Sequence, residues 1–166
     1  MDWILNVILS LSIGCLCGYV LISLIDILLG RRKKYLKKVP YTRLVFETMY
    51  YTGGLLHQNG IKVYPQVDIR YYRSKKYLGI HCPEGRIIIY TKSHSDVVQI
   101  INTVLHEIGH HFQMKTDTKE FKRYSEYQNQ HGYEKNPCEI YARDFASLHQ
   151  QPCLDFLLAK GIIVQV

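Results

Sequence analysis

The stretch SDVVQIINTVLHEIGHHFQ, from Ser95 to Gln113, has a strong helical pattern. Ser95 is a suitable residue for capping the start of a helix, and Asp96 suits the first turn. At about 100° per residue, one arc of this helix collects its apolar side chains, which are Val97, Val98, Ile101, Val104, Leu105, Ile108 and Phe112. This arc predicts the face that packs on the core. The opposite arc contains two histidines and a glutamate, which a purely structural helix does not require.

The polar arc contains His106-Glu107-Ile108-Gly109-His110, an H-E-x-x-H sequence. Side chains four residues apart on a helix have Cβ atoms about 5 to 6 Å apart, so His106 and His110 can bind one Zn²⁺. Glu107 is about 60° round the helix from His110, where it can reach a water at the metal without being a ligand. That position suits a general base. The alternative is a solvated helix face, but chance gives this spacing only roughly 0.02 times in such a chain.

A catalytic zinc site also needs a third protein ligand and an open coordination position. The best candidate is Glu139, in a helix that Asn136-Pro137 predicts from Cys138 to about His149. The alternatives are that Glu139 only stabilises the helix dipole, or that His131 is the ligand instead.

Small residues predict that the two helices pack closely. Ala142 and Ala146 follow Glu139 on the same helix face. Gly109 lies inside the first helix, where glycine costs about 1 kcal/mol relative to alanine. That cost indicates that another backbone passes close to Gly109.

The pattern of residues 41–166 predicts one α+β domain, in which helices pack on a short mixed sheet. A further helix is expected from Tyr41 to Gln58. Alternating, aromatic-rich segments predict strands at 61–64, 68–72, 77–81 and 86–90. The segment 117–136 is expected to be loop with some helix. A last short helix is predicted near 153–160, followed by a strand within 162–166.

The first thirty residues predict a membrane anchor. From Trp3 to Ile25 there are 23 residues without a charge, and a helix of that length spans roughly 34 Å, enough for a hydrocarbon core of about 30 Å. Positive charge follows this stretch and does not precede it, which favours an uncleaved anchor over a signal peptide. We expect a single-pass protein with residues 3–29 in the membrane, a basic linker at 31–40 and the domain in the cytoplasm. Anionic lipid headgroups are expected to contact Arg31, Arg32, Lys33, Lys34, Lys37 and Lys38.

The net charge of +7 comes mostly from this basic linker, because residues 39–166 contain 15 basic and 12 acidic residues. A nucleic-acid-binding protein would carry its basic residues over a folded face, so no nucleic acid partner is expected. A contact between the linker and nucleic acid is the weaker alternative. The five cysteines contain no C-x-x-C pair, so neither a disulfide framework nor a four-cysteine zinc site is indicated.

Over roughly residues 41–150 the chain resembles a gluzincin-type zinc metallopeptidase, most closely the ImmA/IrrE family. The resemblance rests on Gly60-Ile61-Lys62-Val63, Ile87-Ile88-Ile89, Thr103 to His110, and Glu139-x-x-Ala142-x-x-Phe145-Ala146. It implies a zincin-like fold, zinc on His106, His110 and Glu139, and Glu107 as the catalytic base. It also implies a regulatory substrate, since members cut repressor proteins. Arg143 stands where the family often has Asn or Asp, with Asp144 one step on, and this departure affects how a histidine is oriented.

We therefore expect a membrane-anchored zinc endopeptidase that hydrolyses peptide bonds in a protein substrate. The strand Arg86 to Tyr90 is expected to pair with an extended substrate. Candidates for stabilising the oxyanion or orienting a ligand are His131, Tyr133, Arg143 and Asp144. One alternative is an HtpX-like membrane peptidase, which also joins an anchor to H-E-x-x-H. Another is a non-catalytic, zinc-containing binding module tethered to the membrane.

Overall fold

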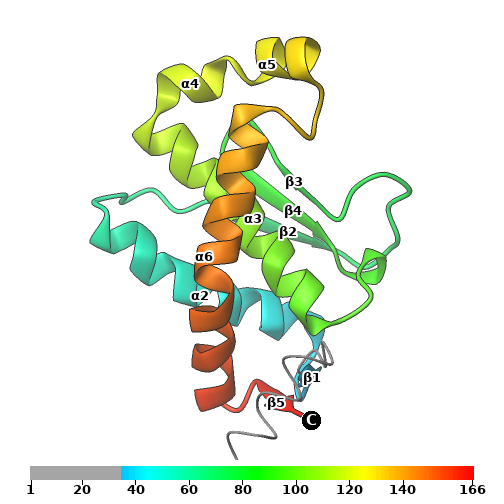
Figure 1. Cartoon of the computed structure of the whole chain (residues 1–166). Coiled ribbons are helices and arrows are strands. Elements are labelled where there is room, and N and C mark those ends of the chain that lie inside the picture. The colour runs from blue at the N-terminus through cyan, green and yellow to red at the C-terminus, as the bar shows by residue number, and fades with distance from the viewer. Residues whose placement is uncertain (1–34) are drawn as a thin grey trace, which may run out of the picture. The chain divides into compact units, whose positions relative to one another are not determined.

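The computed structural model describes residues 35–166, and this part of the chain is α+β, as predicted (Figure 1). Its elements in chain order are β1 (Tyr35–Lys37), α2 (Tyr41–Gln58), β2 (Gln66–Arg70), β3 (Gly79–His81), β4 (Arg86–Tyr90), the 3-10 turn η1 (Thr91–Ser93), α3 (Val97–Thr116), α4 (Thr118–Lys122), α5 (Tyr124–His131), α6 (Pro137–Ala159) and β5 (Ile163–Gln165). The predicted anchor and residues 31–34 lie outside the described residues. Within residues 35–166, no helix combines the length and apolar character needed to cross a bilayer.

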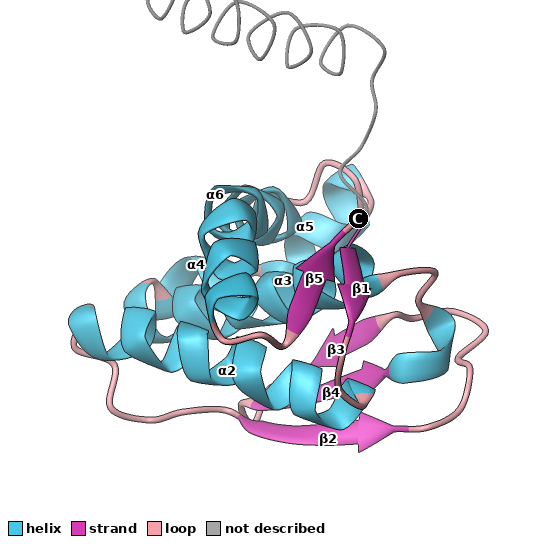
Figure 2. Cartoon of the chain, turned by 90° about the horizontal axis from the view of Figure 1, so that it is seen from below, coloured by secondary structure: helices cyan, strands magenta, loops and turns pink. Residues whose placement is uncertain are grey.

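Helix α3 is the centre of the fold, because it contacts α2, α6 and the sheet. Its start is capped by Asp96, whose side chain accepts a hydrogen bond from the backbone N–H of Gln99 at 2.8 Å. The predicted apolar arc is buried, and Ile101 and Ile108 have no exposed surface. In Figure 2 the helices lie on one side of the three-stranded sheet. The polar arc of α3 is covered as well, so it is not a solvated helix face.

The three-stranded sheet has the order β2-β4-β3. Strand β2 pairs with β4 in parallel, with Gln66 opposite Arg86, and β3 pairs with β4 in antiparallel fashion, with Ile80 opposite Ile88. The buried side chains of β4 are Ile87 and Ile89. The expectation that Arg86–Tyr90 pairs with a substrate is wrong, because both edges of β4 already have partners. Strand β3 is an edge of this sheet.

Two other elements differ from the sequence prediction. Residues 61–64 form no strand: the N–H of Ile61 donates to the carbonyl of Leu56 at 2.9 Å, and the carbonyl of Val63 accepts from Nε2 of His111 at 2.9 Å. The backbone N–H of Ile61 and carbonyl of Val63 are therefore hydrogen-bonded to helices α2 and α3 and not to a neighbouring strand. The two predicted C-terminal helices are one helix, α6, which continues through Pro152. Pro152 is exposed, and buried residues after it hold the helix in place.

The ends of the described part pair with each other. Strand β5 falls within the predicted segment 162–166, and it pairs in antiparallel fashion with β1, so that Tyr35 lies opposite Gln165. Residues 35–37 therefore belong to the folded unit, although the sequence pattern assigns them to the linker. Tyr35 is buried, and the ammonium group of Lys37 lies 4.3 Å from the ring centre of Tyr41.

Candidate metal centre

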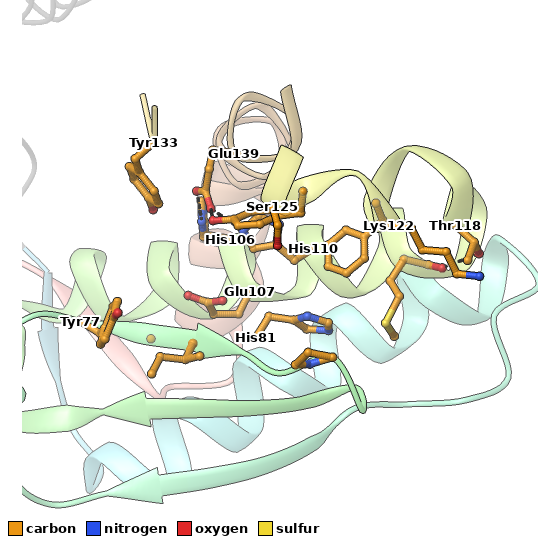
Figure 3. Close-up of a pocket in the computed structure, with 16 residues that line it drawn as sticks. Tyr77, His81, His106, Glu107, His110, Thr118, Lys122, Ser125, Tyr133 and Glu139 are labelled. Carbon is orange, nitrogen blue, oxygen red and sulfur yellow. Dashed lines mark hydrogen bonds and ion pairs between the residues drawn. The ribbon is translucent and has the colours of Figure 1, made fainter. Parts of the chain in front are cut away.

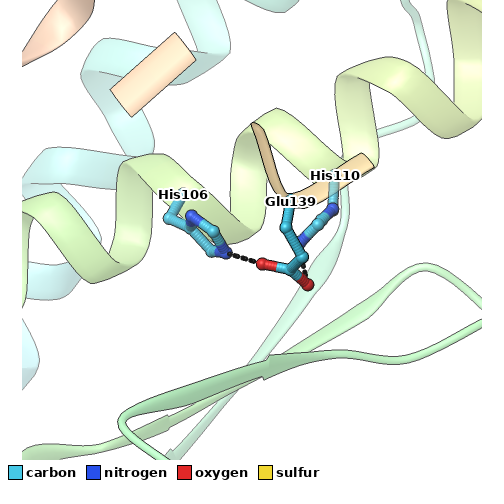
Figure 4. A group of neighbouring side chains, drawn as sticks. All are labelled: His106, His110 and Glu139. Atoms are coloured by element: carbon cyan, nitrogen blue, oxygen red, sulfur yellow. Dashed lines mark ion pairs between the residues drawn. The ribbon is translucent and has the colours of Figure 1, made fainter. Parts of the chain in front are cut away.

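Helices α3 and α6 bring together the three predicted ligands (Figure 4). Nε2 of His106 lies 3.2 Å from Oε2 of Glu139, and Nε2 of His110 lies 3.3 Å from Oε1 of the same carboxylate. Two ligands that hold one Zn²⁺ at about 2.0 to 2.1 Å in tetrahedral geometry lie about 3.3 Å apart. One ligand atom from each residue lies within 4.8 Å of the others, so this group could hold a metal ion.

Glu139 is held in place by its own surroundings. The side chain of Asn136 caps α6 by accepting a hydrogen bond from Cys138 N–H at 3.0 Å, and the hydroxyl of Tyr124 donates to Oε1 of Glu139 at 2.6 Å. Burial acts to raise the pKa of Glu139, but the two imidazoles that face it and the hydrogen bond from Tyr124 outweigh burial and hold this pKa well below its ordinary value. Oε2 of Glu139 is buried and makes no hydrogen bond among residues 35–166, although Nε2 of His106 lies 3.2 Å away. The donor set therefore fits a metal ion.

The approach of α6 to α3 depends on Gly109. A Cβ atom at this position would lie 3.0 Å from Cα of Ala142 and 3.1 Å from Cβ of Phe145. This contact confirms the expectation that another backbone passes close to Gly109. It also explains the small Ala142, which has no exposed surface. The pair sets the distance across which Glu139 meets the two histidines.

Glu107 lies beneath the ligands and against β3. It is 6% exposed. Burial raises the pKa of Glu107 to about 7, with the charge of Glu139 acting in the same direction and His106 opposing it. Gly79 in β3 leaves the necessary space, because a Cβ there would lie 2.8 Å from Oε1 of Glu107 and 2.7 Å from Cγ2 of Thr103. The carboxyl group is thus placed beside the metal ligands without being one of them.

A cleft of about 680 Å³ opens over these residues. Figure 3 shows Glu107 between the metal ligands and β3, with Tyr77 toward one end and Thr118 and Lys122 toward the other. The lining comes from β3, α3, α4, α5 and α6. The cleft therefore joins the candidate ion site, a buried acid and a strand edge, and its volume is typical of a ligand-binding site.

The four other candidate residues fall into two groups. Tyr133 lines the cleft, where burial, and then the neighbouring Glu139 carboxylate, raise the pKa of Tyr133 above its ordinary value. The remaining three residues do not line it. His131 stacks on Tyr127 with ring centres 6.3 Å apart, Arg143 donates to Glu134 at 3.0 Å, and Asp144 is exposed on α6. Of the two candidate third ligands, the structure places Glu139, not His131, beside the histidines.

In the part of the chain that the structure describes, one of the two histidines, His110, lacks a hydrogen-bonded partner that would orient its ring. Nδ1 of His110 is buried and has no hydrogen-bond partner among residues 35–166. The orientation of this ring is set by packing instead, against Phe121 and Tyr124 at 6.1 and 6.0 Å between ring centres. No carboxylate or amide of α6 accepts a hydrogen bond from Nδ1 of His110. That is the orienting role that the sequence put in question by having Arg143 where the family often has Asn or Asp.

His81 is a residue of the cleft that sequence reasoning did not single out. Both of its ring nitrogens are buried without a partner in the described part of the chain. Burial, and then His110, His111 and Lys115, lower the pKa of His81 to about 3. A buried imidazole of this kind is a functional candidate. No short-range motif contains it, because β3 reaches α3 only through tertiary folding.

The substitution His81→Leu should stabilise the metal-free protein. It removes two buried nitrogens without partners, which is worth about 1 kcal/mol at neutral pH. The folded pKa of about 3 lies below the ordinary value, so the wild type loses stability as the pH falls, because only the unfolded chain takes up a proton. Between about pH 7 and 4.5 the gap between the two proteins should widen by about 2 kcal/mol.

Urea unfolding in the presence of EDTA measures this difference at both pH values. The exposed His57 provides a control, since His57→Leu changes no buried imidazole. If wild type and His81→Leu lose stability in parallel on acidification, His81 is not buried in its neutral form.

Comparison of the chain with protein-family models, with curated proteins and with solved structures found no match.

Proposed function

We propose that this chain is a zinc-dependent metalloendopeptidase that hydrolyses peptide bonds in a protein substrate. The observation that supports it best is the meeting of His106, His110 and Glu139 at ligand distances, beside a buried Glu107 that is not a ligand. Two imidazole nitrogens and a carboxylate are a donor set that suits Zn²⁺, and three protein ligands leave a fourth position open. When bound there, zinc would polarise a carbonyl group and lower the pKa of water.

The protein residues have distinct tasks in this proposal. Glu107 accepts a proton from the attacking water at its carboxylate and returns it to the leaving amine. The hydroxyl of Tyr133 is the candidate donor to the developing oxyanion, because Tyr133 is the one residue of the four further candidates that lines the cleft. Tyr124 orients Glu139 through its 2.6 Å hydrogen bond.

Strand β3 takes the substrate-pairing role that the sequence pattern assigned to β4. Its hydrogen bonds fix which backbone groups face outward: Tyr90 N–H donates to Leu78, and Cys82 N–H donates to Arg86. The residues between these pairs, Gly79 and His81, therefore turn their backbone groups away from β4. Both residues line the cleft. An extended peptide can add to this edge and pass over Glu107.

The remaining features of the proposal extend the sequence resemblance. We propose an ImmA/IrrE-like peptidase of zincin-like fold, anchored by residues 1–30, with its basic linker on anionic lipid and a regulatory protein as its substrate. An HtpX-like peptidase would share the same site. A non-catalytic zinc module would share the ligands but would not turn over a substrate.

Zinc-dependent proteolysis tests the proposal. Full-length protein, purified in detergent and stripped with a chelator, should cut casein only after zinc is restored. Glu139→Gln should lose zinc and cleavage together, because a neutral amide replaces the charged ligand. Asp155→Asn is the matched control, since Asp155 is an exposed carboxylate on the same helix.

Mass spectrometry of the products and metal analysis of the protein provide the two measurements. If stoichiometric zinc is bound by His106, His110 and Glu139 while casein and a mixed peptide library stay intact, the peptidase proposal fails. The non-catalytic module would then be the better description.

A further inference from the structure

A basic and aromatic loop connects β2 to the edge strand β3. It comprises residues 71–78, Tyr-Tyr-Arg-Ser-Lys-Lys-Tyr-Leu, and is called the basic loop below. Its three cations, Arg73, Lys75 and Lys76, are all exposed. Lys92 on the adjacent turn η1 is exposed as well.

The basic loop is ordered by hydrogen bonds centred on Ser74. The N–H of Ser74 donates to Oγ of Ser93 at 2.9 Å. Oγ of Ser74 accepts from the N–H groups of Lys76 and Tyr77 at 3.2 and 3.0 Å. Nε of Arg73 donates to the carbonyl of Lys92 at 3.4 Å, which joins the loop to η1. Because the backbone is fixed in this way, binding does not have to order the loop itself, only the side chains of its cations.

The basic loop carries uncompensated positive charge. Within residues 35–166, no salt bridge involves Arg73, Lys75, Lys76 or Lys92. The carboxylate nearest the basic loop along the chain, Asp68, is paired with Arg70 at 2.5 Å, and the one nearest Lys92, Asp96, caps α3. Exposed cations that serve only solubility are normally mixed with acids, whereas three cations lie on this loop and a fourth, Lys92, on the turn joined to it.

The basic loop is continuous with the cleft. Tyr77 lines the cleft, and the ammonium group of Lys76 lies 4.9 Å from the centre of the Tyr77 ring. The next residues, Gly79 and Ile80, belong to β3 and line the cleft too. Figure 3 shows Tyr77 at the end of the cleft where β3 begins. A peptide lying along β3 therefore leaves the cleft beside these cations.

We propose that the basic loop selects substrates that carry acidic side chains on one side of the cleaved bond. This inference rests on the proposed function and names the class of substrate for that site. The cations lie at one end of β3, so the acidic residues occupy only one side of the cut. A peptide that runs antiparallel to β3 places its C-terminal part there, whereas a parallel one places its N-terminal part there.

A protein segment fits this surface better than a nucleic acid. The cations lie in line with a strand edge whose backbone groups at Gly79 and His81 suit an extended peptide. A nucleic acid would follow a broader positive face, whereas Arg86 and Arg70 on the neighbouring strands are already paired with Glu84 and Asp68.

A charge-reversal experiment tests the inference. Full-length, zinc-loaded protein is incubated with a mixed peptide library, and the residues flanking each cut are read by mass spectrometry. Wild type should enrich Asp and Glu on one side of the cut by about three- to tenfold, the effect of two or three exposed ion pairs. Lys75→Glu/Lys76→Glu should reverse the preference toward Lys and Arg. The control is Lys62→Glu/Lys135→Glu, which changes the same charge at exposed positions outside the cleft lining.

Salt and binding measurements keep this test separate from the test of catalysis. The preference should weaken as ionic strength rises, because exposed charges are screened. The same library is also passed over immobilised Glu107→Gln protein. This protein should retain acidic peptides preferentially, whether or not the wild type cuts them. If no peptide is cut but acidic peptides are retained through Lys75 and Lys76, the proposed function fails, and only the part of the inference that concerns binding of acidic peptides stands.

Two results would overturn the inference. One is an unchanged flanking-residue profile, in cleavage and in retention, for Lys75→Glu/Lys76→Glu. The other is a loss of binding to a single-stranded DNA oligonucleotide or to anionic vesicles in this variant while its peptide profile stays that of wild type.

Discussion

Glu107→Gln should bind zinc as the wild type does and lose most of its peptide-bond cleavage. The zinc should stay because the three residues at ligand distances are His106, His110 and Glu139. Cleavage should fall by about 10²- to 10⁴-fold, the usual contribution of a general base, because an amide cannot take a proton from water. The substitution keeps the shape of the side chain between β3 and the ligands.

The same variant should be more stable than the wild type above neutral pH when metal is absent. Burial raises the pKa of Glu107 to about 7, so the folded protein resists losing a proton that the unfolded chain releases at lower pH. Wild-type stability therefore falls as the pH rises from about 4.5 through 7. Glutamine has no such proton, so the variant should not show this decline.

Initial rates, zinc content and urea unfolding at about pH 6 and pH 8 separate these effects. Glu84→Gln is the control, because Glu84 is an exposed carboxylate that pairs with Arg86 at 3.0 Å. A Glu107→Gln protein that cuts at the wild-type rate would remove Glu107 as the base. Loss of zinc from Glu107→Gln would instead indicate that Glu107 helps to build the metal site.

Local patterns in the sequence predicted the elements that carry the metal ligands. The spacing of His106 and His110 and the apolar arc of α3 follow from helix periodicity, which is a property of neighbouring residues. The cap at Asn136 located the start of α6 in the same way, although not its continuation through Pro152. These two helices were enough to name Glu139 as the best candidate for the third ligand, but not to exclude His131.

Long-range pairing could not be read from these patterns. Whether β3 or β4 lies at the sheet edge depends on strand order, which is set by contacts between segments distant in the chain. The same holds for the pairing of β1 with β5 and for His81, which meets α3 only after the sheet has packed on it. Gly109 is the exception: a glycine in the middle of a helix, together with the small Ala142 on the second helix, predicted a close tertiary contact that the structure shows.

That contact makes Gly109→Leu the substitution with the largest expected effect on the fold. Even a Cβ would lie 3.0 Å from Cα of Ala142, a backbone atom that moves only if α6 moves. Leucine adds three more carbons beyond Cβ and gains about 1 kcal/mol of helix propensity. A net loss in the free energy of unfolding therefore measures the cost of the packing conflict. We expect destabilisation by about 3 kcal/mol or more and a loss of zinc affinity, because α6 carries Glu139 away from the histidines.

The control is a glycine in helix α2. Gly54 of α2 is exposed, and a Cβ there would meet no atom within 4 Å, so Gly54→Leu should stabilise the protein by up to about 1 kcal/mol. Urea unfolding and zinc titration of both variants decide the matter. Because the two glycines are both replaced inside helices, opposite signs can come only from tertiary packing. Equal stability and equal zinc affinity in both variants would mean that α3 and α6 do not meet at Gly109, and the site built on their contact would lose its support.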